Sequence, residues 1–252
     1  IYRMPSFSND GRKIVYVKEG GNNEQGRTFS KKSGLYVTNK DGSNTKWLKV
    51  GGEYPQFSAD NKKILYQTGG TYFGNLTKSL KSIDLNGQHE KTLITSKYAN
   101  RLVPSPDNKW LAFSNLHKVY LAPMPTTGKT LDLDNKTKVV PVSQISKDAG
   151  TNLHWSGDSK TIHFTMGEEY FSTKINERFK FFENAPDSIS PPKEKGWAIN
   201  LVAKMDKPKG KIAFTNARII TMEGNKVIEN GTIVIQENKI TTLGKTADIE
   251  LD

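Results

Sequence analysis

Four aspartates, each two residues after a serine, are the first candidates for acid–base chemistry in this chain. The pairs are Ser8 and Asp10, Ser58 and Asp60, Ser105 and Asp107, and Ser156 and Asp158. A carboxylate can act as a general acid or base when its surroundings tune its pKa, but one active site does not need four spaced copies. A serine and an aspartate two residues apart can instead bond nearby backbone N–H groups and hold a tight turn. We therefore predict a structural role for these eight side chains, in turns between strands.

Histidines are the next candidates, as bases or metal ligands. The four are His89, His117, His154 and His163. No two stand two residues apart, and no carboxylate cluster accompanies them at the spacing of a metal site. We predict that His154 and His163 are packed or partly exposed structural residues. Glu168 and Glu169 are adjacent on a predicted strand, so their side chains point to opposite faces and form no acid–base dyad. With no Gly-x-Ser-x-Gly elbow and no phosphate loop, the sequence predicts no catalytic, cofactor-binding or metal-binding residue.

The serine–aspartate pairs belong to a longer repeat that organises most of the chain. Its clearest copy reads Pro-Gln-Phe-Ser-Ala-Asp-Asn-Lys-Lys-Ile-Leu-Tyr at residues 55–66. The serines of the four copies are 50, 47 and 51 residues apart. A period of this size with strand-like content is typical of β-propellers, in which each repeat forms one blade.

Apolar residues follow each turn at a period of two, which indicates a strand. The alternating pairs are Ile14 and Tyr16, Ile64 and Tyr66, Leu111 and Phe113, and Ile162 and Phe164. The positions between them hold Val15, Leu65, Ala112 and His163. Since the second face is also mostly apolar, we expect these strands to be covered on both sides. A blade packed between two neighbours meets that condition, so the predicted fold class is all-β, with four propeller blades.

The chain divides into three parts by composition and repeat. Residues 1–183 are the predicted propeller, with blades of about 50 residues. Residues 184–208 are a predicted linker rich in proline and lysine, with one strand at 197–205. Residues 209–252 form a small antiparallel unit, with a hairpin expected about Asn230 and Gly231. This unit is too short to bury a core alone, so we predict that it packs against a further part of the protein.

Three features of the sequence resemble known families. The Pro-x-Phe-Ser-x-Asp-x-Lys-x-Ile-x-Tyr phrase is similar to the blade repeat of TolB-like propellers, over residues 1–175, and the Leu-Tyr-Val-Thr-Asn at 35–39 resembles surface-layer propellers. The tail resembles the opening of amidohydrolase-superfamily enzymes, through residues 210–222, 230–235 and 239–244. In that family this segment begins a β-sandwich beside a metal-dependent (β/α)8 barrel, and some members carry a TolB-like propeller before it. The family's next landmark, a His-x-His metal motif, does not occur within the 252 residues.

The resemblance implies a function for a longer parent polypeptide, of which we expect this chain to be a fragment because it begins at Ile1 without Met. The parent would be an amidohydrolase that breaks C–N bonds with water activated by a zinc-like divalent metal in its barrel, with no cofactor in this segment. The propeller would gate substrate or bind a protein or small-molecule partner, and the barrel and remaining sandwich strands would pack against this chain. The alternatives are a non-enzymatic periplasmic propeller that binds proteins or glycans, and the propeller cap of a serine peptidase. The resemblance to TolB implies a periplasmic or secreted location.

Composition excludes some classes and disfavours others. The chain has no cysteine, so disulfides and thiolate chemistry are excluded. No apolar run reaches eighteen residues, so no membrane span is predicted. The net charge is +11, but the basic residues are mostly single or paired and no stacking surface with interleaved aromatics accompanies them. Nucleic-acid binding is therefore disfavoured.

Overall fold

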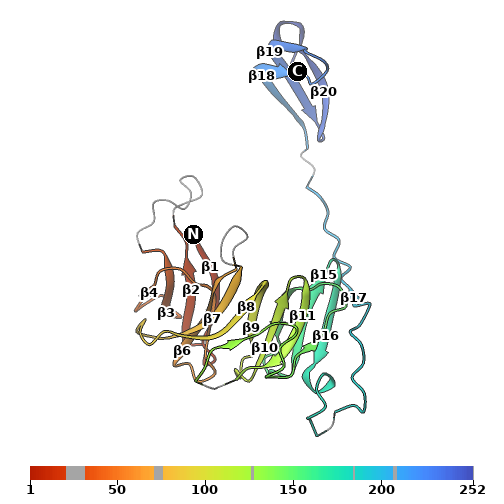
Figure 1. The fold of residues 1–252 in the computed structure, drawn as a ribbon. Helices are drawn as coiled ribbons and strands as arrows, with labels where there is room; N and C mark the ends of the chain where they lie inside the picture. Colours follow the sequence, from red (N-terminus) through yellow and green to blue (C-terminus); the bar gives the residue numbers. More distant parts are fainter. Residues whose placement is uncertain (21–31, 71–75, 126–127, 184, 207–208, 252) are drawn as a thin grey trace. The chain divides into compact units, whose positions relative to one another are not determined.

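The computed structural model describes residues 1–20, 32–70, 76–125, 128–183, 185–206 and 209–251. It contains two compact units, Ile1–Ile199 and Asn200–Asp252 (Figure 1). The first unit runs past residue 183, because the short strand β17 at Trp197–Ala198 pairs with β16 of the same unit.

In the described part of the first unit, four mainly antiparallel sheets follow one another in chain order, and we call them blades 1 to 4. Blade 1 consists of β1 (Tyr2–Phe7), β2 (Lys13–Lys18), β3 (Gly34–Asn39) and β4 (Lys46–Lys49). Blade 2 consists of β5 (Glu53–Phe57), β6 (Lys63–Gly69), β7 (Thr77–Asp84), β8 (Lys91–Lys97) and β12 (Leu131–Asp132). Blade 3 consists of β9 (Ala99–Pro104), β10 (Trp110–Asn115), β11 (Lys118–Pro123) and β13 (Ser143–Gln144). Blade 4 consists of β14 (Thr151–Trp155), β15 (Thr161–Met166), β16 (Glu169–Lys174) and β17. The predicted all-β fold class is confirmed.

Blade 2 borrows its outermost strand from the connection that follows β11. The strand β12 pairs in parallel with β8, through Leu131 opposite Ile94. Leu133, just after β12, is fully buried, and its N–H donates to the Thr95 carbonyl. This segment therefore ties blade 3 back to blade 2.

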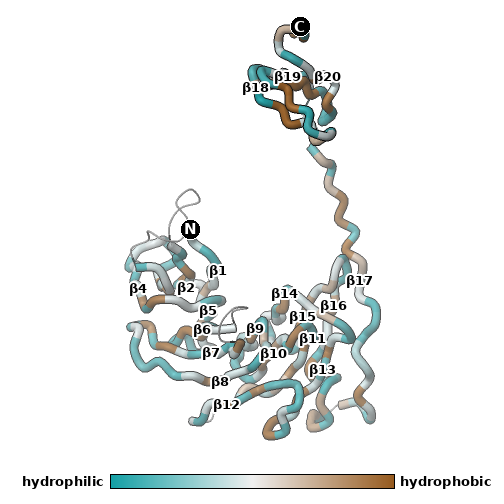
Figure 2. The backbone as a smooth tube through the Cα atoms, turned by 45° about the horizontal axis from the view of Figure 1, so that its top comes forward, coloured by the Kyte–Doolittle hydropathy of each residue, from teal (hydrophilic) through white to brown (hydrophobic). Residues whose placement is uncertain are grey.

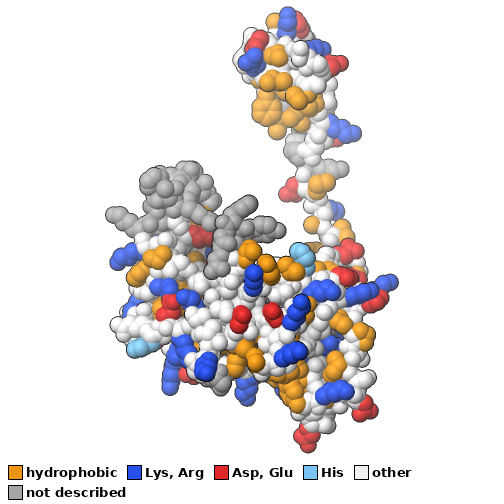
Figure 3. All heavy atoms as spheres, in the orientation of Figure 1, with side chains coloured by type: hydrophobic (Ala, Val, Ile, Leu, Met, Phe, Trp, Pro, Cys, Tyr) orange, Lys and Arg blue, Asp and Glu red, His pale blue; other side chains and the backbone are white. Residues whose placement is uncertain are grey.

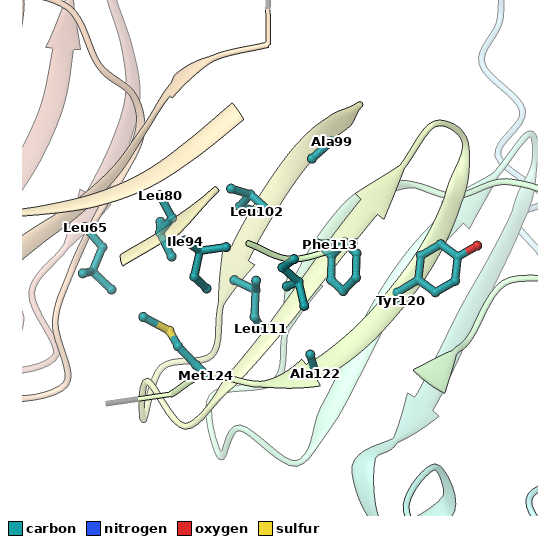
Figure 4. Close-up of a cluster of buried hydrophobic side chains, with 11 residues drawn as sticks. Leu65, Leu80, Ile94, Ala99, Leu102, Leu111, Phe113, Tyr120, Ala122 and Met124 are labelled. Atoms are coloured by element: carbon teal, nitrogen blue, oxygen red, sulfur yellow. The ribbon is translucent and has the colours of Figure 1, made fainter. Parts of the chain in front are cut away.

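The core lies between consecutive blades. Leu65 and Leu80 of blade 2 belong to one cluster with Leu102, Leu111 and Phe113 of blade 3 (Figure 4). Equivalent clusters join blades 1 and 2 and blades 3 and 4. The predicted apolar pairs of blades 2 to 4 are at most 1% exposed, because each lies against the preceding blade. In blade 1, Val15 is buried against blade 2, whereas Ile14 and Tyr16 are half-buried and line a shallow apolar pocket.

The strand predicted at residues 197–205 is shorter than expected. Only Trp197 and Ala198 pair, opposite Tyr170 and Glu169 of β16. The Ile199 N–H still donates to the Glu168 carbonyl, at 2.7 Å. Ala198 pairs with Glu169, which is the first residue of β16, so β16 offers residues 201–205 no further partner. Leu201, Val202 and Met205 are exposed.

The second unit is one antiparallel sheet of β18 (Lys211–Ile220), β19 (Val227–Gln236) and β20 (Lys239–Lys245) in its described residues. The apolar centre of β19 is brown in Figure 2. Large apolar side chains of β18 and β20 are exposed, among them Ile212, Phe214, Ile220 and Ile240, and Figure 3 shows a hydrophobic patch on this unit. This sheet does not enclose a core of its own.

The expected hairpin about Asn230 and Gly231 is wrong, since β19 runs straight through both residues. Asn230 has a left-handed φ of 55°, and the register with β18 shifts where Gly231 faces Ala217. A Cβ on Gly231 would lie 2.4 Å from Cδ1 of Ile219. Glycine therefore stands at a β-bulge, where the side chain of Ile219 leaves no room for a Cβ. The two-residue turn lies at Glu237 and Asn238 instead.

Candidate binding pocket over the inner strands

The structure places the eight serine and aspartate side chains in four separate turns, each between the first two strands of a blade. In every turn the serine hydroxyl donates to the aspartate Oδ1 at 2.6 Å. The same serine oxygen accepts the backbone N–H five residues later, and the aspartate Oδ1 accepts the N–H two residues later at 3.0–3.1 Å. The hydrogen bond from its serine is the main cause that lowers the pKa of Asp10, Asp60 and Asp158. A carboxylate held ionised inside its own turn is poorly suited to act as a general acid.

Neighbouring turns are also linked to one another, which sequence reasoning missed. The Asn9 N–H donates to Oδ1 of Asn61 at 2.9 Å. The Ala59 N–H donates to Oδ1 of Asn108 at 2.7 Å, and the Asp107 N–H to Oγ of Ser159 at 3.0 Å. These three acceptor residues all have a left-handed φ in their turns. The repeat pattern itself carried this signal, since Asn or Ser recurs three residues after the turn serine.

The histidines do not converge on a metal site. The rings of His154 and His163 stack at 5.1 Å, and the Tyr170 hydroxyl lies 2.6 Å from Nδ1 of His163. Burial, and then the neighbouring His154, lower the pKa of His163. His89 is exposed and lies 2.8 Å from an Asp84 carboxylate oxygen. Among the described residues, no group of three or more His, Asp or Glu side chains is arranged to hold a metal ion.

A pocket of about 440 Å³ lies at one end of the first strands of blades 2, 3 and 4, which are β5, β9 and β14 and which we call the inner strands. It takes Tyr54 from β5, Asn100 and Arg101 from β9, and Ser114 from β10. The remaining lining residues are Leu116 and His117 of the β10–β11 turn and residues 149–153, of which the last three begin β14. Sequence reasoning did not select these residues, because they come from three repeats, and the position four residues before the turn serine holds a different residue type in each: Tyr54, Arg101 and Asn152.

Among the described residues that line the pocket, Arg101 is the one with a permanent charge, and its guanidinium stacks on Tyr54. Its guanidinium carbon lies 3.3 Å from the centre of the Tyr54 ring, a cation–π contact. Its Nε is buried without a hydrogen-bond partner. Within the described residues, no carboxylate pairs with this guanidinium or lines the pocket. An unpaired, half-buried cation of this kind favours an anionic ligand.

The pocket is also lined by strained backbone. Tyr54, Leu116 and Asn152 have φ of 48°, 55° and 54°, a conformation that costs bulky residues free energy. Leu116 occupies the turn position that Gly167 fills in blade 4, and its side chain is 57% exposed. Strain at non-glycine residues tends to cluster at functional sites. Tyr54 and Asn152 stand four residues before their turn serines, the position that Met4 occupies in blade 1 with φ of 53°. At these two residues the left-handed φ therefore belongs to the repeat.

Solved structures identify the fold. TolB from Acinetobacter baumannii superposes with a TM-score of 0.52 over 94% of this chain, at 15% identity. This chain has a TolB-like β-propeller fold. A putative TolB from Agrobacterium tumefaciens matches with a TM-score of 0.48 at 13% identity, covering 91% of this chain and 80% of that one. The Pseudomonas aeruginosa periplasmic gluconolactonase PpgL matches with 0.47 at 12%, covering 96% and 71%.

These similarities have clear bounds. The chain spans about half (52%) of the Acinetobacter TolB. No family model and no curated protein matches the sequence. The predicted TolB-like propeller is thus confirmed, while no comparison supports the amidohydrolase resemblance of the tail. In the described residues, no helix has the length and hydrophobicity to cross a membrane.

Proposed function

We propose that the propeller is a ligand-recognition module, and that its parent polypeptide is a metal-dependent amidohydrolase in which the propeller admits substrate or docks a partner. One observation carries the recognition role, namely the pocket in which the unpaired Arg101 stacks on Tyr54. Ligand sites are typically concave, with apolar walls and few polar groups placed among them. A pocket of about 440 Å³ has the size for a small molecule or for the end of a peptide.

The second unit supports the hydrolase part of the proposal. Its described sheet leaves Phe214, Ile220 and Ile240 more than half exposed, and exposed apolar faces mark contact surfaces. Further sandwich strands would cover this face, as the tail's resemblance to amidohydrolases implies. The zinc-like metal would be held by barrel residues outside this chain, and the present residues would supply recognition only.

The recognition role is tested by a fragment screen with isotope-labelled chain, in which NMR reports the amides that shift. We expect the hits to shift residues 100–101, 114–117 and 149–153. Hits that cluster elsewhere, or a pocket that no fragment perturbs, would show that the pocket is not a recognition site.

The hydrolase role is tested on the full natural polypeptide. We expect a bound divalent metal by elemental analysis and hydrolysis of amide or lactam substrates that a chelator abolishes. Residues 1–252 alone serve as the control and should neither retain zinc nor hydrolyse these substrates. A parent without metal and without hydrolysis would refute this part and leave the recognition role standing.

That outcome would favour the second candidate, a periplasmic or secreted propeller that binds a protein or glycan without catalysis. The observation in its favour is the pocket itself, because Arg101 and Tyr54 need no barrel to bind a ligand.

A further inference from the structure

We infer that the pocket over Tyr54 and Arg101 binds an N-acylated α-amino acid, either free or as the carboxyl end of a peptide. The inference rests on the proposed recognition role and adds the class of ligand. It follows from the charge, hydrogen-bonding groups and apolar surface of the lining.

The charge of the lining comes from Arg101. Arg101 presents a guanidinium whose donors have no acceptor among the described residues. The planar fork of a guanidinium matches a carboxylate with two parallel hydrogen bonds. Stacking on Tyr54 holds the fork in place at 3.3 Å, so less side-chain freedom remains to be lost on binding.

Two neutral side-chain amides, those of Asn100 and Asn152, also line the pocket. Asn100 Nδ2 donates to the Leu116 carbonyl at 2.6 Å, and Asn152 Nδ2 donates to Oγ1 of Thr165 at 2.8 Å. Both side-chain amides are oriented by these bonds. Their Oδ1 atoms accept no hydrogen bond within the described residues, so they offer acceptors for an N–H group of a ligand. An acylated amino acid carries such an N–H one carbon away from its carboxylate.

Part of the lining is apolar. Leu116, Ala149 and Leu153 line the same pocket. Leu116 is exposed although its left-handed backbone would suit glycine better. An apolar amino-acid side chain would contact these residues, so the inferred ligand has an apolar body beside the carboxylate. Phosphate, which lacks both the N–H and the apolar body, fits the lining less well.

The test compares N-acetyl-L-leucine with N-acetyl-L-leucinamide, which has the same shape without the charge. Binding to the whole chain is followed by NMR titration. We expect the acid to shift the amides of Arg101 and Leu116 and to bind about tenfold more tightly than the amide, a ratio that corresponds to about 1.4 kcal/mol. Arg101→Gln should bind the acid and the amide with about equal affinity. The control Arg218→Gln, on the exposed second unit, should leave it unchanged.

A second pair of variants keeps the test independent of any effect of Arg101 on folding. Leu116 is exposed, and both Asn and Asp tolerate its left-handed φ. Leu116→Asp should bind the acid several-fold more weakly than Leu116→Asn, which carries no charge. Both substitutions should have an equally small effect on the affinity for the amide. Equal affinity for acid and amide, or the same response in both Leu116 variants, would overturn the inference. If neither probe binds, the inference is wrong, and the fragment screen decides separately whether the pocket recognises another ligand.

Discussion

The side-chain amide of Gln67 makes two hydrogen bonds to the backbone of Leu102. Its Nε2 donates to the Leu102 carbonyl at 2.7 Å, and its Oε1 accepts the Leu102 N–H at 3.1 Å. Gln67 is 2% exposed and lies on β6 of blade 2, whereas Leu102 lies on β9 of blade 3. The second strand of blade 2 is thus bonded by a buried side chain to the first strand of blade 3, at Leu102, which is a member of the core cluster of Figure 4.

We expect Gln67→Leu to lower the free energy of unfolding by about 1–3 kcal/mol, since it leaves buried backbone groups unpaired. Urea denaturation measures the change. Gln56→Leu is the control, because Gln56 makes one longer bond, to the Pro104 carbonyl at 3.3 Å, and should cost less. A Gln67→Leu variant as stable as wild type would show that the bond contributes nothing net.

The link between turns predicts a separable effect at Asn108. Glycine keeps the left-handed φ of 57° but removes both the acceptor for the Ala59 N–H and the donor to the Ser105 carbonyl, so Asn108→Gly should cost about 1 kcal/mol. Asn108→Ala should cost about 1 kcal/mol more, because alanine is strained there. Asn44→Gly, at an exposed left-handed residue with φ of 52°, is the matched control in urea denaturation. Equal effects at both positions would rule out a stabilising link.

The structural role predicted for the serines is tested at Ser105, which is fully buried. Ser105→Ala removes the acceptor for the Trp110 N–H at 3.0 Å and the donor to Asp107. We expect a loss of about 1–3 kcal/mol in the free energy of unfolding, measured by thermal and urea denaturation. The exposed Ser188→Ala should have no measurable effect. Unchanged stability in Ser105→Ala would mean that the turn does not depend on its serine.

We predict that the free energy of unfolding depends on pH through Glu90. Burial alone would raise the pKa of Glu90, but hydrogen bonds from Lys49, Lys81 and Tyr66 outweigh it and lower that pKa from 4.5 to about 2. The folded-state pKa lies below the unfolded value, so the stabilisation is complete above pH 4.5 and is lost as the pH falls towards 2. Its size is on the order of 1 kcal/mol, because the side chain is a third exposed and solvent screens the interaction.

The measurement is urea denaturation of wild type and Glu90→Gln across this pH range. The stability difference should be largest at neutral pH and should shrink as the acid limit is approached. Glu194→Gln removes the exposed pair with Lys147 and should show almost no difference at any pH. A difference for Glu90→Gln that does not change with pH would contradict the assignment.

Short-range features of this fold were predictable from residues close in the chain. The serine–aspartate turns and the period-two strands depend on hydrogen bonds and side-chain alternation within a few residues. Local reasoning failed at Asn230 and Gly231, where the same dipeptide suits a turn or a bulge. Pairing with β18 and the close approach of Ile219 decided for the bulge.

The sequence by itself therefore determined the all-β class, the repeat and the turns, because their causes are local. Only the tertiary structure decided which side chains meet. Arg101 and Tyr54 occupy the same position, four residues before the turn serine, in neighbouring repeats, and nothing local to either residue indicates their contact. The stacking of blade 3 on blade 2 brings the guanidinium over the ring, in the lining of a pocket shared by three blades. Packing between repeats, rather than any motif, creates the candidate site.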